Sequence, residues 1–102
     1  GDVEAAIVRL RRGVELAPGE LRLHFHLGLV LGKGGYVFEA IRELERALSI
    51  DPTHFAAAKN LAVLYQNAGF RAKAADTWQR ALALAPDAPT RDSIRERVMG
   101  LL

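Results

Sequence analysis

Three prolines stand at equal distances along the chain and divide it into segments of matching pattern. Pro18, Pro52 and Pro86 are 34 residues apart. Proline has no backbone N–H and disfavours helix in the residue before it, so each proline ends a helical segment. A fixed period of this length is typical of repeat proteins, in which successive units stack on one another. The proline spacing therefore predicts a repeat architecture.

Other residue types recur at the same interval. The recurring positions carry small residues, large apolar residues or glycine: Ala6, Ala40 and Ala74; Leu10, Leu44 and Trp78; Leu16, Ile50 and Leu84; Gly35 and Gly69. Small residues let two helices approach closely, and the large apolar residues fill the space between them. The two glycines follow a helical segment, where a positive φ is usually needed.

Apolar residues recur at helical spacing in six stretches, so the sequence predicts six helices. We expect them over residues 2–17, 21–33, 37–50, 54–68, 71–84 and 89–102. The predicted outer side of residues 37–50 carries glutamates and arginines. Their spacing predicts i,i+3 ion pairs between Glu39 and Arg42 and between Glu43 and Arg46.

The two complete copies resemble the tetratricopeptide repeat (TPR), a 34-residue helix–turn–helix family. The first copy offers Leu27-Gly28, Ala40, Leu44, Ala47 and Pro52, and the second Leu61-Ala62, Tyr65, Ala74, Trp78, Ala81 and Pro86. His24 and Ala58 stand where the family has tryptophan, and Leu31 where it has an aromatic residue. The resemblance implies an all-α fold: a right-handed superhelical array of antiparallel helix pairs, that is, a TPR-like α-solenoid.

We interpret residues 1–102 as a single TPR-like domain. Residues 2–17 match the second helix of a truncated repeat, residues 21–54 and 55–88 are the two repeats, and residues 89–102 are a capping helix. The cap has one apolar stripe for the last repeat: Ile94, Val98, Leu101 and Leu102. The first residue is glycine, which indicates a segment of a longer protein or a tag remnant.

Composition excludes several classes of site. The chain has no cysteine, so it forms neither disulfides nor thiolate metal sites, and its compartment, cytoplasm or periplasm, stays open. The net charge of +2 gives weak support for nucleic-acid binding, and no apolar run is long enough to cross a membrane. The arginine- and alanine-rich composition is typical of GC-rich bacteria. We therefore expect neither a nucleic-acid partner nor membrane insertion.

The motifs that suggest chemistry are incomplete. Gly32-Lys33-Gly34-Gly35 lacks the strand and the Ser or Thr of a phosphate-binding loop. His24 and His26 are two residues apart and point to different sides of a helix, so they do not form a metal-ligand pair. Ser49 and Ser93, on predicted outer surfaces, have no histidine nearby in sequence. We expect no enzymatic activity, no cofactor and no metal.

The inner, concave wall of the first helices remains as a candidate peptide-binding site. Its expected residues combine apolar contacts with lysines and amides: Phe25, Leu29, Lys33, Lys59, Asn60, Val63, Gln66 and Asn67. Lysine can meet a carboxylate, and an amide can hold a ligand's main chain. The simpler alternative is that Phe25 and Leu29 pack under the neighbouring helix. These two residues occupy the Lys and Asn positions of the chaperone-tail clamp found in some TPR proteins, which disfavours that ligand.

The predicted function is a non-catalytic module that binds a peptide or helix of a partner protein in this concave groove. Two alternatives stay open. The unmatched apolar face of residues 2–17 would join copies of the chain into a homo-oligomer. The segment would otherwise be the accessory domain of a larger enzyme.

Overall fold

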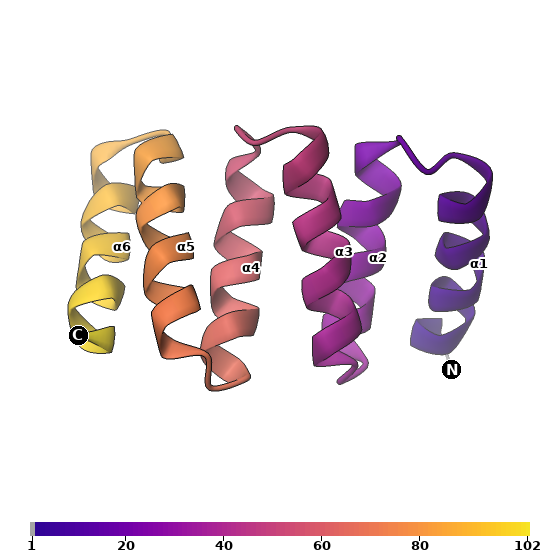
Figure 1. Ribbon diagram of the computed structural model, residues 1–102, viewed down its shortest axis with the longest axis horizontal. Helices are drawn as coiled ribbons and strands as arrows, with labels where there is room; N and C mark the ends of the chain where they lie inside the picture. Colours follow the sequence, from indigo (N-terminus) through magenta and orange to yellow (C-terminus); the bar gives the residue numbers. More distant parts are fainter. Residues whose placement is uncertain (1) are drawn as a thin grey trace. The chain divides into compact units, whose positions relative to one another are not determined.

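The computed structural model describes residues 2–102 and confirms the all-α prediction (Figure 1). These residues form six helices and no strand: α1 (Asp2–Leu16), α2 (Leu21–Lys33), α3 (Val37–Ile50), α4 (Phe55–Asn67), α5 (Arg71–Leu84) and α6 (Ala88–Leu101). The observed bounds differ from the predicted ones by at most one residue at any helix end. None of the helices in this part of the chain has the length and apolarity that a bilayer crossing requires.

The helices group into two compact units, the first ending at Pro52 and the second comprising Thr53–Leu102. In the first unit α2 packs against both α1 and α3, and in the second α5 packs against both α4 and α6. The pairs α2–α3 and α4–α5 are antiparallel hairpins with short turns (Figure 1). The boundary between the units lies two residues before residue 54, the predicted end of the first repeat.

Small residues bring the two helices of each pair together. In α3, Ala40, Leu44 and Ala47 are fully buried. Gly28 of α2 lies so close to Leu44 that an added Cβ atom would be 2.8 Å from the Leu44 Cγ atom. In the second pair the equivalent of Gly28 is Ala62, which is also fully buried. The predicted close packing at the small positions is therefore confirmed in both repeats.

The turn after each first helix needs a glycine. Gly35 and Gly69 both have φ of +86°, a conformation that other residues rarely adopt. This places the next backbone N–H, that of Tyr36 or Phe70, within 2.9 Å of the carbonyl oxygen five residues earlier, at Leu31 or Tyr65. The two glycines thereby allow backbone carbonyl groups at the helix end to accept hydrogen bonds. The positive φ at both positions agrees with the sequence prediction.

Side-chain caps set the starts of α4 and α6. The Nδ1 atom of His54 accepts a hydrogen bond from the Ala57 N–H at 3.0 Å. An Asp87 carboxylate oxygen accepts from the Thr90 N–H at 2.8 Å, and hydrogen bonds from the side chain and the backbone N–H of Thr90 hold the pKa of Asp87 below its ordinary value. Each cap satisfies one N–H that has no partner within its helix. His54 is therefore the residue before α4 and not, as predicted, its first residue.

The predicted ion pairs along α3 are wrong. Glu39 pairs with Arg11 of α1 at 2.6 Å, and Glu43 contacts His24 of α2 at 2.8 Å. Neither Arg42 nor Arg46 forms an ion pair with another of the residues 2–102. Spacing along one helix does not reveal the neighbouring helix, whose side chains here offer closer partners. Tyr36 similarly donates to the Glu4 carboxylate of α1 at 3.2 Å, which raises the pKa of Tyr36.

His24 fills the position of the family's tryptophan through hydrogen bonds. Its side chain is 2% exposed. Nδ1 lies 2.8 Å from the Glu43 carboxylate, and Nε2 lies 2.6 Å from the carbonyl oxygen of Pro18. Each ring nitrogen therefore has an oxygen atom within hydrogen-bonding distance. A buried polar pair thus holds α3 and the turn before α2 together.

The apolar stripe of α6 is shorter than predicted. Ile94 and Val98 are buried, and Leu101 is half-buried. Leu102 follows the end of the helix and is 84% exposed, so its assignment to the stripe is wrong.

Gly28→Ala should destabilise the chain although Ala62 is tolerated at the equivalent position. The added methyl collides with the branch point of buried Leu44, and overpacking of this kind costs about 1–3 kcal/mol, partly offset by the roughly 1 kcal/mol of helix propensity that alanine adds. Gly13→Ala in α1 is the matched control, because its methyl meets only the movable ends of Leu23 at 3.3 Å. Urea unfolding followed by circular dichroism should show a lower unfolding free energy for Gly28→Ala and no decrease for Gly13→Ala. Equal stabilities would refute the close approach.

Glu43→Ala should cost about 1–3 kcal/mol of unfolding free energy, because it leaves a buried ring nitrogen of His24 without a partner. Glu43→Gln should lose less unfolding free energy, since the amide oxygen of glutamine can still accept a hydrogen bond from the His24 ring. Glu15→Ala removes an exposed ion pair to Arg12 and should cost at most about 0.5 kcal/mol. Thermal unfolding of the three variants measures their order of stability. A Glu43→Ala protein as stable as Glu15→Ala would contradict the role given to His24.

Candidate binding surfaces

The predicted inner-wall residues of the first unit lie on α2 and differ in exposure. Phe25 and Leu29 are half-buried, and Lys33, the last residue of the helix, is exposed. The ring centroids of Phe25 and His26 are 5.6 Å apart. Part of the surface of Phe25 and Leu29 is therefore used in packing, and part remains accessible.

The other five predicted residues lie on α4 in the second unit. Lys59, Gln66 and Asn67 are exposed, whereas Asn60 and Val63 are half-buried. Asn60 donates its side-chain N–H to the Ala56 carbonyl at 2.7 Å. Gln66 accepts a hydrogen bond from the Trp78 indole at 3.2 Å. These bonds fix the orientation of both amides and leave the Asn60 oxygen and the Gln66 NH₂ group facing outward for other partners.

A pocket of about 320 Å³ opens between α4 and α6, over the buried edge of α5. We call it the Lys59 pocket. Its lining combines two cations, two hydroxyls and an apolar floor: Lys59, Trp78, Pro89, Thr90, Ser93, Ile94 and Arg97. The guanidinium carbon of Arg97 lies 5.0 Å from the centroid of the Trp78 ring. Trp78 itself is 1% exposed, so it is a rigid floor.

Of the eight residues predicted from the sequence, this pocket contains Lys59. It also contains Ser93, which the sequence placed on an outer surface; that placement is wrong. The 34-residue register carries the missing signal: Ser93 is the equivalent of Lys59, and Arg97 is the equivalent of Val63. The register continues into α6 although the residue types that mark a repeat do not. Extending it would have placed both residues on the same face as the predicted site.

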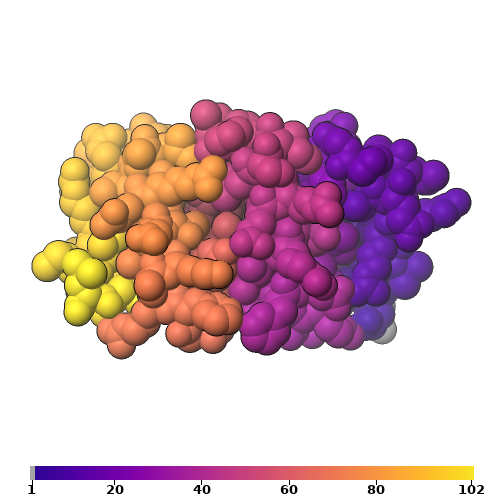
Figure 2. Space-filling view, in the orientation of Figure 1, coloured from indigo at the N-terminus to yellow at the C-terminus, as the bar shows by residue number. Residues whose placement is uncertain are grey.

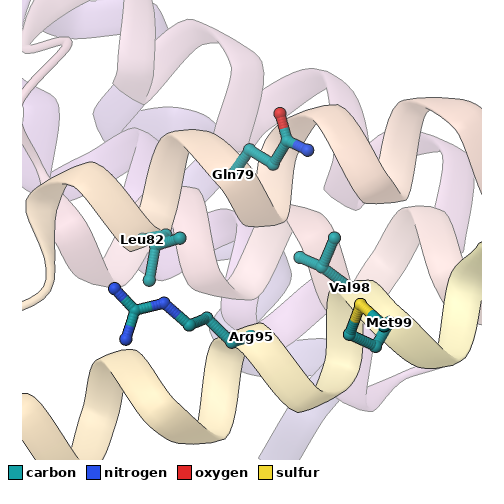
Figure 3. A pocket seen from close by; sticks show the side chains of 5 residues that line it. All are labelled: Gln79, Leu82, Arg95, Val98 and Met99. Atoms are coloured by element: carbon teal, nitrogen blue, oxygen red, sulfur yellow. The ribbon is translucent and has the colours of Figure 1, made fainter.

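A second, shallower depression lies between α5 and α6. We call it the Met99 groove; it measures about 470 Å³ and is lined by Gln79, Leu82, Arg95, Val98 and Met99. Figure 3 shows Leu82 and Gln79 of α5 opposite the three residues of α6. Met99 is 71% exposed. In the space-filling view of Figure 2, the orange atoms of α5 and the yellow atoms of α6 lie side by side. The groove offers apolar contact and was not predicted.

The face of α1 that corresponds to the paired face of α3 is open. Ala40, Leu44 and Ala47 are fully buried and Leu48 is 3% exposed. Their equivalents in α1, one period earlier, are all half-exposed: Ala6, Leu10, Gly13 and Val14. The complete pair places a first helix over this face, and α1 has no such helix among residues 2–102.

Side chains that carry catalytic or metal chemistry do not converge in the described part of the chain. Residues 2–102 contain no cluster of three His, Asp or Glu side chains arranged to hold a metal. Both ring nitrogens of His24 face oxygen acceptors, and the Nδ1 atom of His54 caps α4. Two of the three histidines thus serve the fold.

Comparison with known proteins gives no matching family model and no matching curated sequence. Solved structures do match. The type III secretion translocator chaperone SycD of Yersinia enterocolitica has a TM-score of 0.89 at 17% identity, over 99% of this chain and 72% of that one. The Arabidopsis OM64 TPR domain has a TM-score of 0.87 at 15% identity, over 99% of this chain and 84% of that one.

YrrB, described as a TPR protein with an unusual peptide-binding site, has a TM-score of 0.82 at 26% identity. The match covers 92% of this chain and 48% of YrrB, so the chain spans about half of that protein. These structures share the helix-pair architecture found here, and the 34-residue period of the sequence explains why. The chain therefore has the TPR fold, an α-solenoid of the kind found in protein-interaction modules.

Proposed function

We propose that the chain is a non-catalytic module that binds a segment of a partner protein through the residues predicted for the inner wall, which lie on α2 in the first unit and on α4 in the second. The observation that carries the proposal is the unused polar capacity of α4. Lys59, Gln66 and Asn67 are exposed, and two amides of this face are held in fixed orientations with a free donor or acceptor. Peptide binding by YrrB, stated in that protein's description, supports the same use of the fold here.

The chemistry of the proposed face suits an extended or helical peptide. The Gln66 NH₂ group can donate to a main-chain carbonyl while its oxygen stays bonded to Trp78, and the Asn60 oxygen can accept a main-chain N–H. Lys33 and Lys59 offer charge to acidic side chains. Phe25, Leu29 and Val63 offer apolar contact with the surface that packing leaves accessible. Fixed side chains lose little entropy on binding, which favours affinity.

Selection of random peptides on the immobilised chain, followed by calorimetry, tests the proposal. Leu29→Arg and Lys59→Glu should each weaken the selected peptides at least about tenfold, because each places a misfit or a like charge in the contact surface. Arg42→Glu and Arg80→Glu are matched controls, since both arginines are exposed on second helices and unpaired within residues 2–102. Circular dichroism should stay helical for all four. Full-strength binding by both inner-face variants would refute the site.

A second candidate function is self-association through α1, favoured by its open apolar face. Half-exposed Leu10 corresponds to Leu44, which is fully buried when a first helix covers it. A second copy of the chain would supply such a helical surface in a symmetric pair.

Light scattering across a dilution series decides whether the chain associates. We expect a dimer at high concentration that Leu10→Glu abolishes and Val8→Glu does not, because Val8 is 66% exposed at the outer position equivalent to Arg42. A strict monomer at millimolar concentration would contradict self-association.

A further inference from the structure

We propose that the Lys59 pocket recognises the carboxylate side chain of an Asp or Glu residue within a bound partner segment. The proposal rests on the proposed peptide-binding function and adds a specificity to it. It is carried by the joint presence, in one pocket, of two unpaired cations, the Ser93 hydroxyl and a buried aromatic floor.

The two cations of the pocket have no carboxylate partner. Some basic residues of the chain do have one, such as Arg11 with Glu39 and Arg95 with Asp92, and others, such as Arg42, do not within residues 2–102. Lys59 and Arg97 differ from the other unpaired cations because they line one pocket together. Neither Lys59 nor Arg97 forms an ion pair with any of residues 2–102. A cationic pocket without an internal counter-charge attracts an external anion, and apolar walls strengthen that attraction by excluding water.

Trp78 positions Arg97. The guanidinium lies over the indole ring at 5.0 Å, and the indole N–H is held by Gln66 at 3.2 Å. A guanidinium stacked on an aromatic face keeps its N–H groups available at the edge, where they can donate to both oxygens of a carboxylate. Because the ring is buried and hydrogen-bonded, little conformational entropy is lost when Arg97 binds.

The Ser93 hydroxyl adds a donor on the α6 side of the pocket, and it forms no hydrogen bond within the part of the chain that the structure describes. The Thr90 hydroxyl and the Thr90 backbone N–H are both engaged with the Asp87 carboxylate, which caps α6. The α6 N-terminus is thereby already supplied with a carboxylate, so the anion site consists of the side chains of the pocket.

The size and lining favour a carboxylate side chain over other anions. About 320 Å³ is at the lower end of the roughly 300–1,000 Å³ of small-molecule sites, enough for one side chain and its neighbouring backbone. Trp78, Ile94 and Pro89 suit the methylene groups of a glutamate. A phosphate site generally adds several converging backbone N–H groups, and here the one at Thr90 is taken by Asp87.

The single tryptophan of the chain makes the pocket directly observable. The probes are two peptides with blocked ends, acetyl-Ala-Leu-Glu-Leu-Ala-amide and its glutamine counterpart, titrated into the ¹⁵N-labelled chain. We expect the glutamate peptide to shift the Trp78 indole and the Thr90 and Ser93 amide resonances and to bind about tenfold more tightly than the glutamine peptide at low salt. The difference should shrink as salt is added.

Substitutions assign the preference to the pocket. Lys59→Gln and Arg97→Gln should each reduce the ratio of the two affinities several-fold, and the double variant should bring it near one. Arg95→Gln is the matched control, because Arg95 lies on the same helix but lines the Met99 groove. It should leave the ratio unchanged. Circular dichroism verifies that each variant stays folded.

The outcomes separate this inference from the proposed function. Equal binding of the two peptides, or a ratio that survives the double variant, overturns the carboxylate site. Binding of library peptides that Leu29→Arg weakens would leave the proposed function standing in that case. Tighter binding of the phosphoserine version of the peptide overturns the preference for a carboxylate. Binding only by a peptide with a free C-terminus overturns the assignment to a side chain.

Discussion

Close approach of two helices at small residues is the constraint on which each unit depends. Ala40, Ala47, Ala74 and Ala81 are fully buried, and each stands where a larger side chain would push the helices apart. With the backbones close, Leu44 or Trp78 fills the remaining volume and fixes the rotation of its partner helix. That rotation decides which residues of the first helix face outward. The proposed binding face is therefore set by alanines that are themselves fully buried.

The two repeats solve the same packing problem differently, and the difference has a consequence at the surface. The first pair combines Gly28 with Leu44, and the second combines Ala62 with Trp78 at the equivalent positions. The larger ring extends from the core to the floor of the Lys59 pocket, where it supports Arg97 and holds Gln66. One core substitution between repeats thus connects the buried interior of the second unit with its candidate site.

Sequence periodicity predicts what depends on one helix or one turn. It places the helix ends within a residue, and it predicts the positive φ of Gly35 and Gly69, because these features follow from local chain chemistry. It fails where a side chain chooses among neighbours on another helix. The pairing of Glu39 with Arg11, and of Glu43 with His24, depends on distances between helices that no spacing within α3 contains.

For a related reason, the sequence predicted only part of the lining of the Lys59 pocket. Lys59 stands in a recognisable repeat, whereas Ser93 and Arg97 stand in a helix whose sequence has lost the repeat's markers but kept its register. Register is a geometric property that survives changes of residue type, because each helix must still present one face to its neighbour. Packing requires nothing of the exposed residues Ser93 and Arg97, so their types need not follow the repeat pattern. A repeat that has drifted in composition is therefore where unpaired charges such as Arg97 are to be sought, and continuing the period past its last clear copy is the way to find them.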